Sequence, residues 1–340
     1  MLSRLKSNLK FDVYGLGNAI VDLLVFTDDL YLQEISLQKG HMTLADSKTQ
    51  AYLLKLLDGK EIRMVSGGSA ANTMAAIAKA GGKAFYTGKI AKDPYGEFYR
   101  FHLLEEGVHF DVHPVSETQG STATCVVLIT PDAERTMSTH LGASILLTEE
   151  DIHKDVLKDS KVLYIEGYLW LNESTRKAAK KAMELAKEYQ IPVSFTFSDQ
   201  FVVEQFKEEF YSLVRSLEFH ILFMNSEEAK SFVETKDLYN ALEYLKNFNN
   251  LIFVTNNKHG SFVIENHTIY EVSGFPVEAI DSTGAGDVFA GGVLFGLTNG
   301  YDSCLSAKIG NFLASKIVQI QGARFNKSYQ DEIKRMLFNA

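Results

Sequence analysis

The sequence has very little cysteine and no long hydrophobic run. Its 340 residues contain two cysteines, Cys125 and Cys304, which lie far apart. Two distant thiols provide neither a disulfide framework nor the spacing of a metal site, and this usage is typical of a reducing compartment. The nine histidines also lack metal-ligand spacing. No apolar stretch approaches the roughly 20 residues that a membrane-spanning helix needs, which argues against an integral membrane protein.

Basic residues are fewer than acidic ones. Lys and Arg number 34, Asp and Glu number 43, and the formal net charge is -9. An acidic surface repels phosphate backbones and anionic lipids, so we expect neither nucleic acid nor membrane as a partner. The basic residues Arg4, Lys6 and Lys10 resemble the start of a targeting signal, but Asp12 and Asn18 break the apolar run that follows. The sequence therefore predicts a soluble, cytoplasmic protein.

Two common nucleotide-binding loops are also missing. Gly82-Lys83 is followed by Ala84, so there is no Gly-x-x-x-x-Gly-Lys-Ser/Thr loop. Residues 15–17 (GLG) lack the third glycine of a dinucleotide fingerprint, because Ile20 stands in its place. These absences argue against a P-loop protein and an NAD-linked enzyme.

Strand-like and helix-like segments alternate in the second half of the chain. Short apolar runs between segments with helical spacing imply a mostly parallel sheet with helices on both faces. The strand-rich segments at about 18–65 and 110–142 do not follow this alternation, and we expect them to form a small sheet over the main domain. Because no linker or repeat separates the parts, we expect a single domain over residues 1–340. The expected strands are 11–17, 64–68, 84–90, 122–130 and 135–143 (joined by a turn at 131–134), 162–169, 192–197, 220–225 and 251–256. The expected helices are 70–80, 95–106, 174–189, 202–217, 226–248, 285–299 and 302–320.

The stretch that carries most chemical information is residues 281–287 (DSTGAGD), which precede an apolar helical run. The small residues Gly284, Ala285 and Gly286 let the backbone approach a ligand closely. Their N–H groups point outward at the positive end of the helix dipole. This arrangement predicts an anion hole suited to a phosphoryl group that gathers charge in its transition state.

Asp287 follows directly, in the first turn of that helix. A carboxylate at this position is suited to accept a proton from an attacking hydroxyl. The alternative is that Ser282 or Thr283 is an ordinary N-cap and that Asp287 only complements the helix dipole.

A second group of residues is suited to sugar hydroxyls, which donate and accept hydrogen bonds. Asn18 and Asp22 are four residues apart in an extended run, so alternation predicts that both lie on one face. Gly68 and Ser69 precede a helix that carries Asn72 one turn along. Glycine here admits a sugar ring. The alternatives are that the first pair faces solvent and that Ser69 simply caps the helix.

Both motifs resemble signatures of a known family. Residues 281–292 (DSTGAGDVFAGG) look like the C-terminal signature of the ribokinase-like (PfkB) carbohydrate and nucleoside kinases, and residues 67–97 resemble their N-terminal signature. Family-like sequence extends from Tyr14 to Phe325. The resemblance implies a three-layer α/β/α sandwich with a central mostly parallel sheet and a small β-sheet lid, with ATP as donor and Mg²⁺ as helper; a monovalent cation stays open. Ser282 departs from the usual threonine but keeps the hydroxyl.

The resemblance also assigns roles on the acceptor side. An arginine just past the lid turn, Arg135, is expected to swing over the transferred phosphate, with a surface arginine as the alternative. The residues assigned to the acceptor are Asn18, Asp22, Gly68, Ser69 and Asn72.

On the nucleotide side, Asn225 and Glu228 resemble the family's Asn-x-x-Glu motif, in which the carboxylate organises Mg²⁺ mainly through water. The alternative is a capping-box pair at a helix start. Thr255, at the end of an apolar strand, is expected near phosphate, and Gly260 is expected to allow close approach of the nucleotide. Asn311 is expected near the adenine pocket.

Within this family the chain resembles the kinases that act on adenosine. The similar segments are residues 164–169 (YIEGYL) and 194–206. A wall made of Leu169, Phe201 and Met42 would hold a purine by stacking and burial. We therefore expect phosphorylation of a purine nucleoside at its 5′-hydroxyl. The alternatives are that these are core residues, and that the acceptor is a free sugar such as ribose or fructose.

A non-catalytic binding protein on the same fold is a further alternative. Such a protein is expected to lose the base or the anion hole, and here Gly284, Gly286 and Asp287 are all present. Expected partners are the small-molecule acceptor and ATP, and the chain is expected to be a monomer or homodimer.

Overall fold

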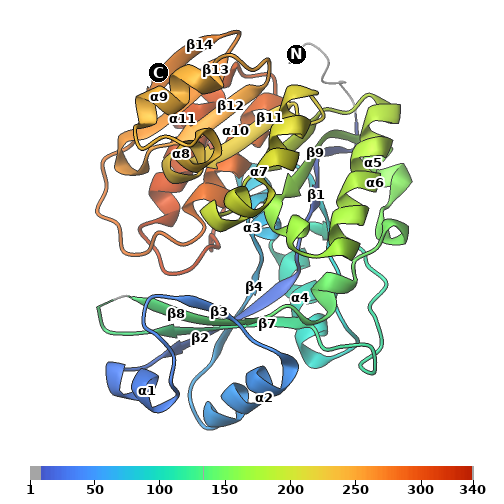
Figure 1. Cartoon of the computed structure of the whole chain (residues 1–340), viewed down its shortest axis with the longest axis vertical. Coiled ribbons are helices and arrows are strands. Elements are labelled where there is room, and N and C mark those ends of the chain that lie inside the picture. Colours follow the sequence, from blue (N-terminus) through green and yellow to red (C-terminus); the bar gives the residue numbers. More distant parts are fainter. Residues whose placement is uncertain (1–8, 133, 339–340) are drawn as a thin grey trace.

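Two β-sheets organise the chain (Figure 1). The computed structural model describes residues 9–132 and 134–338. Arg4, Lys6 and the Ala133 position of the expected turn lie outside these described residues.

The large sheet has nine strands in the order β14-β13-β12-β11-β10-β9-β1-β5-β6. All neighbours from β12 to β6 pair in parallel, and β13 and β14 add an antiparallel edge. The central strands are continuous apolar runs because helices bury both of their faces. The strands are β1 (Phe11–Leu16), β5 (Ala84–Thr87), β6 (His109–Phe110), β9 (Ser160–Glu166), β10 (Val193–Thr196), β11 (Ile221–Asn225), β12 (Leu251–Thr255), β13 (Gly260–Glu265) and β14 (Thr268–Ser273).

Two separate core clusters lie on the two faces of this sheet. One contains Ala182 of α6 and Phe210 of α7, and the other contains Met74 of α3 and Phe289 of α10. These layers confirm the predicted α/β/α sandwich. The helices are α3 (Ser69–Ala80), α4 (Pro94–Glu105), α5 (Lys154–Lys158), α6 (Glu173–Tyr189), α7 (Gln200–Arg215), α8 (Ser226–Val233), α9 (Leu238–Leu245), α10 (Ala285–Thr298), α11 (Ser303–Ile317) and α12 (Gln330–Phe338), with 3-10 turns η2 (Gly142–Leu146), η3 (Glu149–Asp151), η4 (Gly167–Leu171) and η5 (Asn257–His259).

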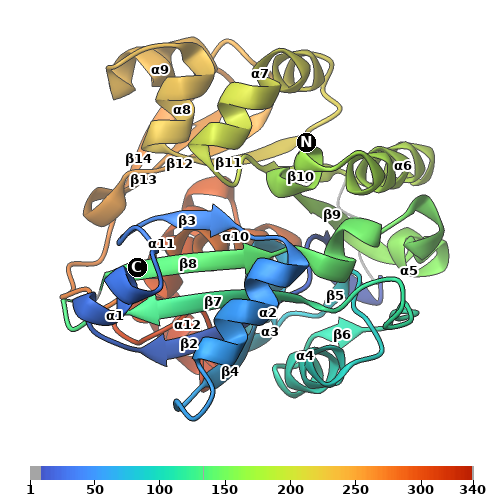
Figure 2. The ribbon, with the colours of Figure 1, turned by 60° about the horizontal axis from the view of Figure 1, so that its bottom comes forward.

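The small sheet lies against one side of the large domain, and α1 and α2 cover one of its faces (Figure 2). Its order is β3-β8-β7-β2-β4. The second strand-rich segment, expected from about residue 110, enters the small sheet only at Ala123. The residues before it belong to the large domain, where β6 pairs with β5 and Val115 forms a bridge with Ala91. The elements are β2 (Ile20–Phe26), α1 (Asp29–Glu34), β3 (Met42–Leu44), α2 (Ser47–Leu56), β4 (Arg63–Gly67), β7 (Ala123–Ile129) and β8 (Arg135–His140).

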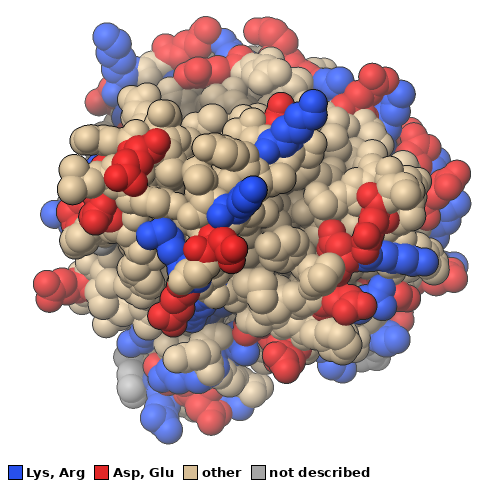
Figure 3. Space-filling view, turned by 90° about the horizontal axis from the view of Figure 1, so that it is seen from below, with Lys and Arg blue, Asp and Glu red and all other residues tan. Residues whose placement is uncertain are grey.

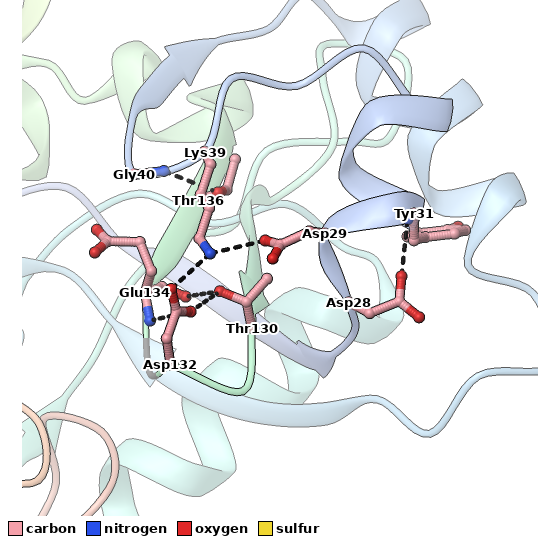
Figure 4. A network of polar contacts seen from close by, with 9 residues as sticks. All are labelled: Asp28, Asp29, Tyr31, Lys39, Gly40, Thr130, Asp132, Glu134 and Thr136. Atoms are coloured by element: carbon pink, nitrogen blue, oxygen red, sulfur yellow. Dashed lines mark hydrogen bonds and ion pairs between the residues drawn. The ribbon is translucent and has the colours of Figure 1, made fainter.

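A polar network ties the end of the β7–β8 hairpin to α1 (Figure 4). Lys39 Nζ lies 2.7 Å from a carboxylate oxygen of Asp29 and 2.6 Å from one of Asp132. The Thr130 hydroxyl donates to Asp132 over 2.6 Å. Such exposed pairs contribute little stability each. Together they fix the hairpin end from which Arg135 begins β8.

Seen from below, the surface carries acidic and basic side chains interspersed among uncharged ones, without a continuous basic patch on the face in view (Figure 3). Within the described part of the chain, no helix combines the length and apolar character needed to cross a membrane.

Candidate active site

The loop before α10, residues 281–286, is called the anion loop here. Gly284 is the N-cap of α10 and has a φ of 73°. A Cβ at this position would lie 2.4 Å from the Cβ of Ala323, whereas a Cβ at Gly286 would meet no described atom within 4 Å. Gly284 is therefore needed for the fold of the loop, and Gly286 borders open space that a ligand can enter.

The three predicted anion-hole amides are not equivalent. The amide of Ala285 donates to the carbonyl of Ser282 over 3.2 Å. Among the described residues, no such bond is seen from the amides of Gly284 and Gly286. In this conformation two of the three amides are therefore available to an anion. Neither Ser282 nor Thr283 is the N-cap, so the simple capping alternative is wrong.

Asp287 joins α10 to α3. Its carboxylate accepts hydrogen bonds from the Ser69 hydroxyl over 2.6 Å and from the Asn72 side-chain amide over 2.9 Å. Burial raises the pKa of Asp287 to about 6, and the bonds from Ser69 and Asn72 and the charge of Arg324 oppose that rise. The hydroxyl of Ser69 does not cap its own helix, because the N-cap of α3 is Gly68.

The Gly67-Gly68 turn brings the hydroxyl-binding candidates together. A Cβ at Gly67 would lie 2.3 Å from an Asp22 carboxylate oxygen, and one at Gly68 would lie 2.2 Å from the Asn18 carbonyl. Gly68 also has a φ of 96°. Asn18 precedes β2 instead of lying in it, so the predicted strand alternation with Asp22 is wrong. The two residues instead pack against neighbouring glycines of one turn.

Asp22 is a carboxyl group in a partly enclosed place. Burial raises its pKa to about 7, the positive charges of Arg324 and Arg135 lower it, and the negative charge of Asp287 raises it further. In its ionised form this carboxyl group can accept a hydrogen bond from a substrate hydroxyl.

Glu166, at the end of β9, is a site residue that our sequence reasoning missed. One carboxylate oxygen accepts from the backbone and side-chain amides of Asn18 over 2.7 and 2.8 Å, and the other accepts from the Ala70 amide over 2.8 Å. Burial raises the pKa of Glu166 to about 7. Its signal in the sequence was a lone charge in the apolar run 162–169 (VLYIEGYL).

Arg135 connects the small sheet to the anion loop. Its guanidinium forms an ion pair with Asp281. The same Asp281 carboxylate accepts from the amides of Thr283 and Gly322 over 2.9 and 2.7 Å. Arg135 therefore reaches the loop expected to hold phosphate, although its partner here is a carboxylate.

Asn225 and Glu228 form a capping box at the start of α8. The Glu228 carboxylate accepts from the backbone and side-chain amides of Asn225 over 3.0 and 2.7 Å. Burial raises the pKa of Glu228 to about 7, and the charges of Asp199 and Asp287 raise it further. The capping alternative is thus confirmed, and it leaves a carboxyl group within electrostatic reach of Asp287.

The remaining nucleotide candidates lie near the antiparallel edge of the large sheet. Thr255 is the partner of Asn225 in the pairing of β11 and β12. Asn311 donates its side-chain amide to the carbonyls of Val272 and Ser273 over 3.0 and 3.3 Å. A Cβ at Gly260 would lie 2.2 Å from the Val272 carbonyl, so packing on β14 accounts for this glycine. Their roles toward a nucleotide stay predictions.

The expected purine wall is only partly assembled. Phe201 is 37% exposed at the start of α7, and its ring lies 6.3 Å from that of half-buried Tyr168. Leu169 has 0% exposure and packs in the core, so the structure does not bring it to an open surface. Met42 is 41% exposed on β3 of the small sheet.

The site as a whole brings together the residues predicted to act as base, anion hole and hydroxyl-binding groups, on converging elements. Four of its carboxyl groups share a raised pKa because burial disfavours their charged forms. Perturbed carboxyl groups clustered beside a helix N-terminus are typical of an active site. These groups are Asp22, Glu166, Glu228 and Asp287.

Comparison with known proteins identifies the family. Residues 44–329 match the family described as pfkB family carbohydrate kinase. The chain is 31% identical to the adenosine kinase of Saccharomyces cerevisiae over 91% of this chain and 95% of that protein. It is 27% identical to a 5-dehydro-2-deoxygluconokinase of Clostridium perfringens over 77% of this chain and 81% of that enzyme. The solved structure of adenosine kinase from Sinorhizobium meliloti has a TM-score of 0.88 and 37% identity, covering 96% of this chain and 99% of its own. The chain is therefore a kinase and belongs to the pfkB family.

Proposed function

We propose that this chain transfers the terminal phosphoryl group of ATP to the 5′-hydroxyl of a purine nucleoside, with Asp287 as general base. The observation that carries the proposal is the Asp287 carboxylate, which Ser69 and Asn72 hold at the first turn of α10. These bonds come from the helix assigned to the acceptor, so the base contacts the acceptor site directly. A pKa of about 6 leaves the carboxyl mostly ionised at neutral pH, as a base requires.

The acceptor binds against Asn18, Asp22, Gly68 and Asn72. The side-chain oxygen of Asn72 is buried and has no partner among the described residues, which suits it to accept a bond from a substrate hydroxyl. Asp287 takes the proton of the reacting hydroxyl while the oxygen of that hydroxyl attacks the terminal phosphorus of ATP. The bond from that phosphorus to the bridging oxygen breaks, and ADP leaves with the electron pair.

The anion loop stabilises charge during this transfer. The free amides of Gly284 and Gly286 lie at the N-terminus of α10, where the helix dipole also favours negative charge. Arg135 is the cation best placed to join them. In the acceptor-bound state the phosphoryl oxygens compete with Asp281 for the guanidinium of Arg135, because an arginine side chain binds phosphate as readily as carboxylate.

Among the described residues no three His, Cys, Asp or Glu side chains are grouped to hold a metal directly, so any Mg²⁺ near Glu228 would bind mainly through water and ATP phosphate. Burial raises the pKa of Glu228, and the negative charges of Asp199 and Asp287 raise it further; a divalent cation beside Glu228 would oppose both effects. Both Glu228 oxygens already accept bonds from Asn225, which favours contact through water. When bound, Mg²⁺ supplies neutralisation of the ATP phosphates.

A nucleoside acceptor is supported by the partly exposed ring of Phe201 beside Tyr168, which offers a flat surface for a base. It also agrees with the adenosine kinases of Saccharomyces cerevisiae and Sinorhizobium meliloti among the relatives. The second candidate is a carbohydrate acceptor, which the similarity to the Clostridium perfringens sugar-acid kinase favours. The hydroxyl-binding groups serve both acceptors equally.

Two measurements test the proposal. A coupled ADP-release screen with adenosine, inosine, guanosine, ribose and fructose should show a clear preference for adenosine. Asp287→Asn should lose turnover by at least about 100-fold while still binding nucleoside and ATP, whereas the exposed control Asp331→Asn should match the wild type. Preference for a free sugar would mean that the acceptor is a sugar and would leave the kinase mechanism unchanged. Turnover of Asp287→Asn within a few-fold of wild type would refute the role of Asp287 as general base.

A further inference from the structure

Arg324 is a buried cation that the proposed mechanism does not use. It lies between α11 and α12 and is 9% exposed. Burying a guanidinium is costly unless its donors are satisfied and its charge is balanced. Such a residue, close to a substrate site, therefore calls for a reason beyond packing.

Its hydrogen bonds span the acceptor turn, a name used here for residues 66–72. The Arg324 Nε donates to the Ser66 carbonyl over 2.9 Å, a terminal nitrogen donates to the same oxygen, and the other terminal nitrogen donates to the Ala71 carbonyl over 2.7 Å. One planar fork thus grips both ends of the turn that contains Gly67, Gly68 and Ser69. A lysine cannot reproduce this geometry with one nitrogen.

Two further groups hold the same turn from other sides. The Tyr99 hydroxyl donates to the Gly67 carbonyl over 3.0 Å, and Glu166 accepts from the Ala70 amide over 2.8 Å. The backbone of the acceptor turn is therefore bonded along its length to α4, β9 and the C-terminal segment. Its conformation decides where Ser69 points, and Ser69 contacts Asp287.

The charge of Arg324 is balanced through space. Among the described residues its hydrogen bonds go to backbone carbonyls, and the carboxyl groups whose negative charge acts on it are Glu106, Asp22 and Asp287. Its positive charge acts on Asp22 and Asp287 and lowers the pKa of both carboxyl groups. The other groups whose titration responds to Asp287 are negative or phenolic: Glu166, Glu228, Tyr164 and Tyr168.

We infer that Arg324 is a positioning residue of the acceptor site, which fixes the acceptor turn through its carbonyls and places a permanent positive charge near Asp22 and Asp287. The inference rests on the proposed function for its catalytic consequence. Its structural consequence, the fixed turn, stands independently of the acceptor.

The experiment compares Arg324→Gln, Arg324→Lys and the control Lys327→Gln, which removes an exposed positive charge three residues away in the same segment. Amide hydrogen exchange of peptides covering 66–72 is measured without ligand. The pH dependence of kcat/KM and the acceptor KM are measured with the preferred acceptor. Arg324→Gln should speed exchange in the acceptor turn and move the acid limb of kcat/KM upward by about one pH unit, since a nearby positive charge is lost.

Arg324→Lys keeps the charge and loses the fork. It should leave the acid limb at its wild-type position, speed exchange in 66–72 and raise the acceptor KM by about fivefold or more. If Arg324→Gln does not fold, Arg324→Lys decides the matter by these readouts. Unchanged exchange and KM in Arg324→Lys, or an unmoved limb in a folded Arg324→Gln, would overturn the inference. If wild type phosphorylates no acceptor, the proposed function fails, and hydrogen exchange alone still decides the role of Arg324.

Discussion

Alanine substitution should lower stability at one glycine of the anion loop and turnover at the other. At Gly284 the φ of 73° costs a residue with a Cβ about 1–2 kcal/mol. A Cβ there also lies 2.4 Å from the Ala323 Cβ, and such overpacking costs about 1–3 kcal/mol. Gly284→Ala should therefore lower the free energy of unfolding by about 2–5 kcal/mol.

Gly286 has no positive φ and no described atom near its Cβ direction. Alanine is the better helix former by up to about 1 kcal/mol, so Gly286→Ala should be as stable as wild type or slightly more stable. Its methyl group enters the open space where we place the phosphoryl group. We expect turnover to fall by about 100-fold, since misplacement of a reacting group by about 1 Å is that costly.

Urea denaturation and coupled ADP release, run on both variants, separate these effects. The expected result is a destabilised Gly284→Ala and a stable but slow Gly286→Ala. If Gly286→Ala retains turnover within threefold of wild type, phosphate does not approach α10 at this position. If Gly284→Ala unfolds at the wild-type urea concentration, the close contact with Ala323 is not a constraint and the loop must be able to rearrange.

Three further variants probe the site. Ser69→Ala removes a bond to the charged form of Asp287 and so raises its pKa above about 6; the acid limb of kcat/KM should move upward by about one unit, and a downward shift would contradict the assignment. Arg135→Gln should lower kcat by about tenfold or more with little change in acceptor KM, measured at saturating ATP; an unchanged kcat would mean that Arg135 serves only Asp281. Glu228→Gln should raise the half-saturating Mg²⁺ concentration at fixed ATP. In wild type that concentration should rise as pH falls through about 7, because protonation of Glu228 competes with the cation.

The sequence predicted the two helices that build the site. The observed α3 (Ser69–Ala80) and α10 (Ala285–Thr298) begin within one residue of the expected 70–80 and 285–299. Both begin after glycine and carry small apolar residues at helical spacing, and such signals are local. The contact of Ser69 and Asn72 with Asp287 follows from packing these two helices together, and the local signals of neither helix predict it.

Elements of the small sheet were harder to predict. The first strand-rich segment contains α2 (Ser47–Leu56), whose start is marked by Asp46 accepting from the Thr49 amide.

In the large domain, the expected helix 226–248 is two helices, because Glu234 adopts a left-handed φ of 61° and Asp237 caps a new start. Caps and breaks of this kind are short-range signals, and the longer periodic pattern around them masked them.

Glu166 and Arg324 show why part of the site could not be predicted from the sequence. Glu166 binds the Ala70 amide 96 residues away, and Arg324 binds the Ser66 carbonyl 258 residues away. The partners are backbone groups, which nearly every residue possesses, so no residue type at the receiving position indicates the contact. A charged side chain within an apolar segment still indicates that burial must be compensated somewhere. In this chain both charges bond to the acceptor turn, and Glu166 also accepts from Asn18, so we assign these two charges to the site although neither is expected to touch the reacting atoms.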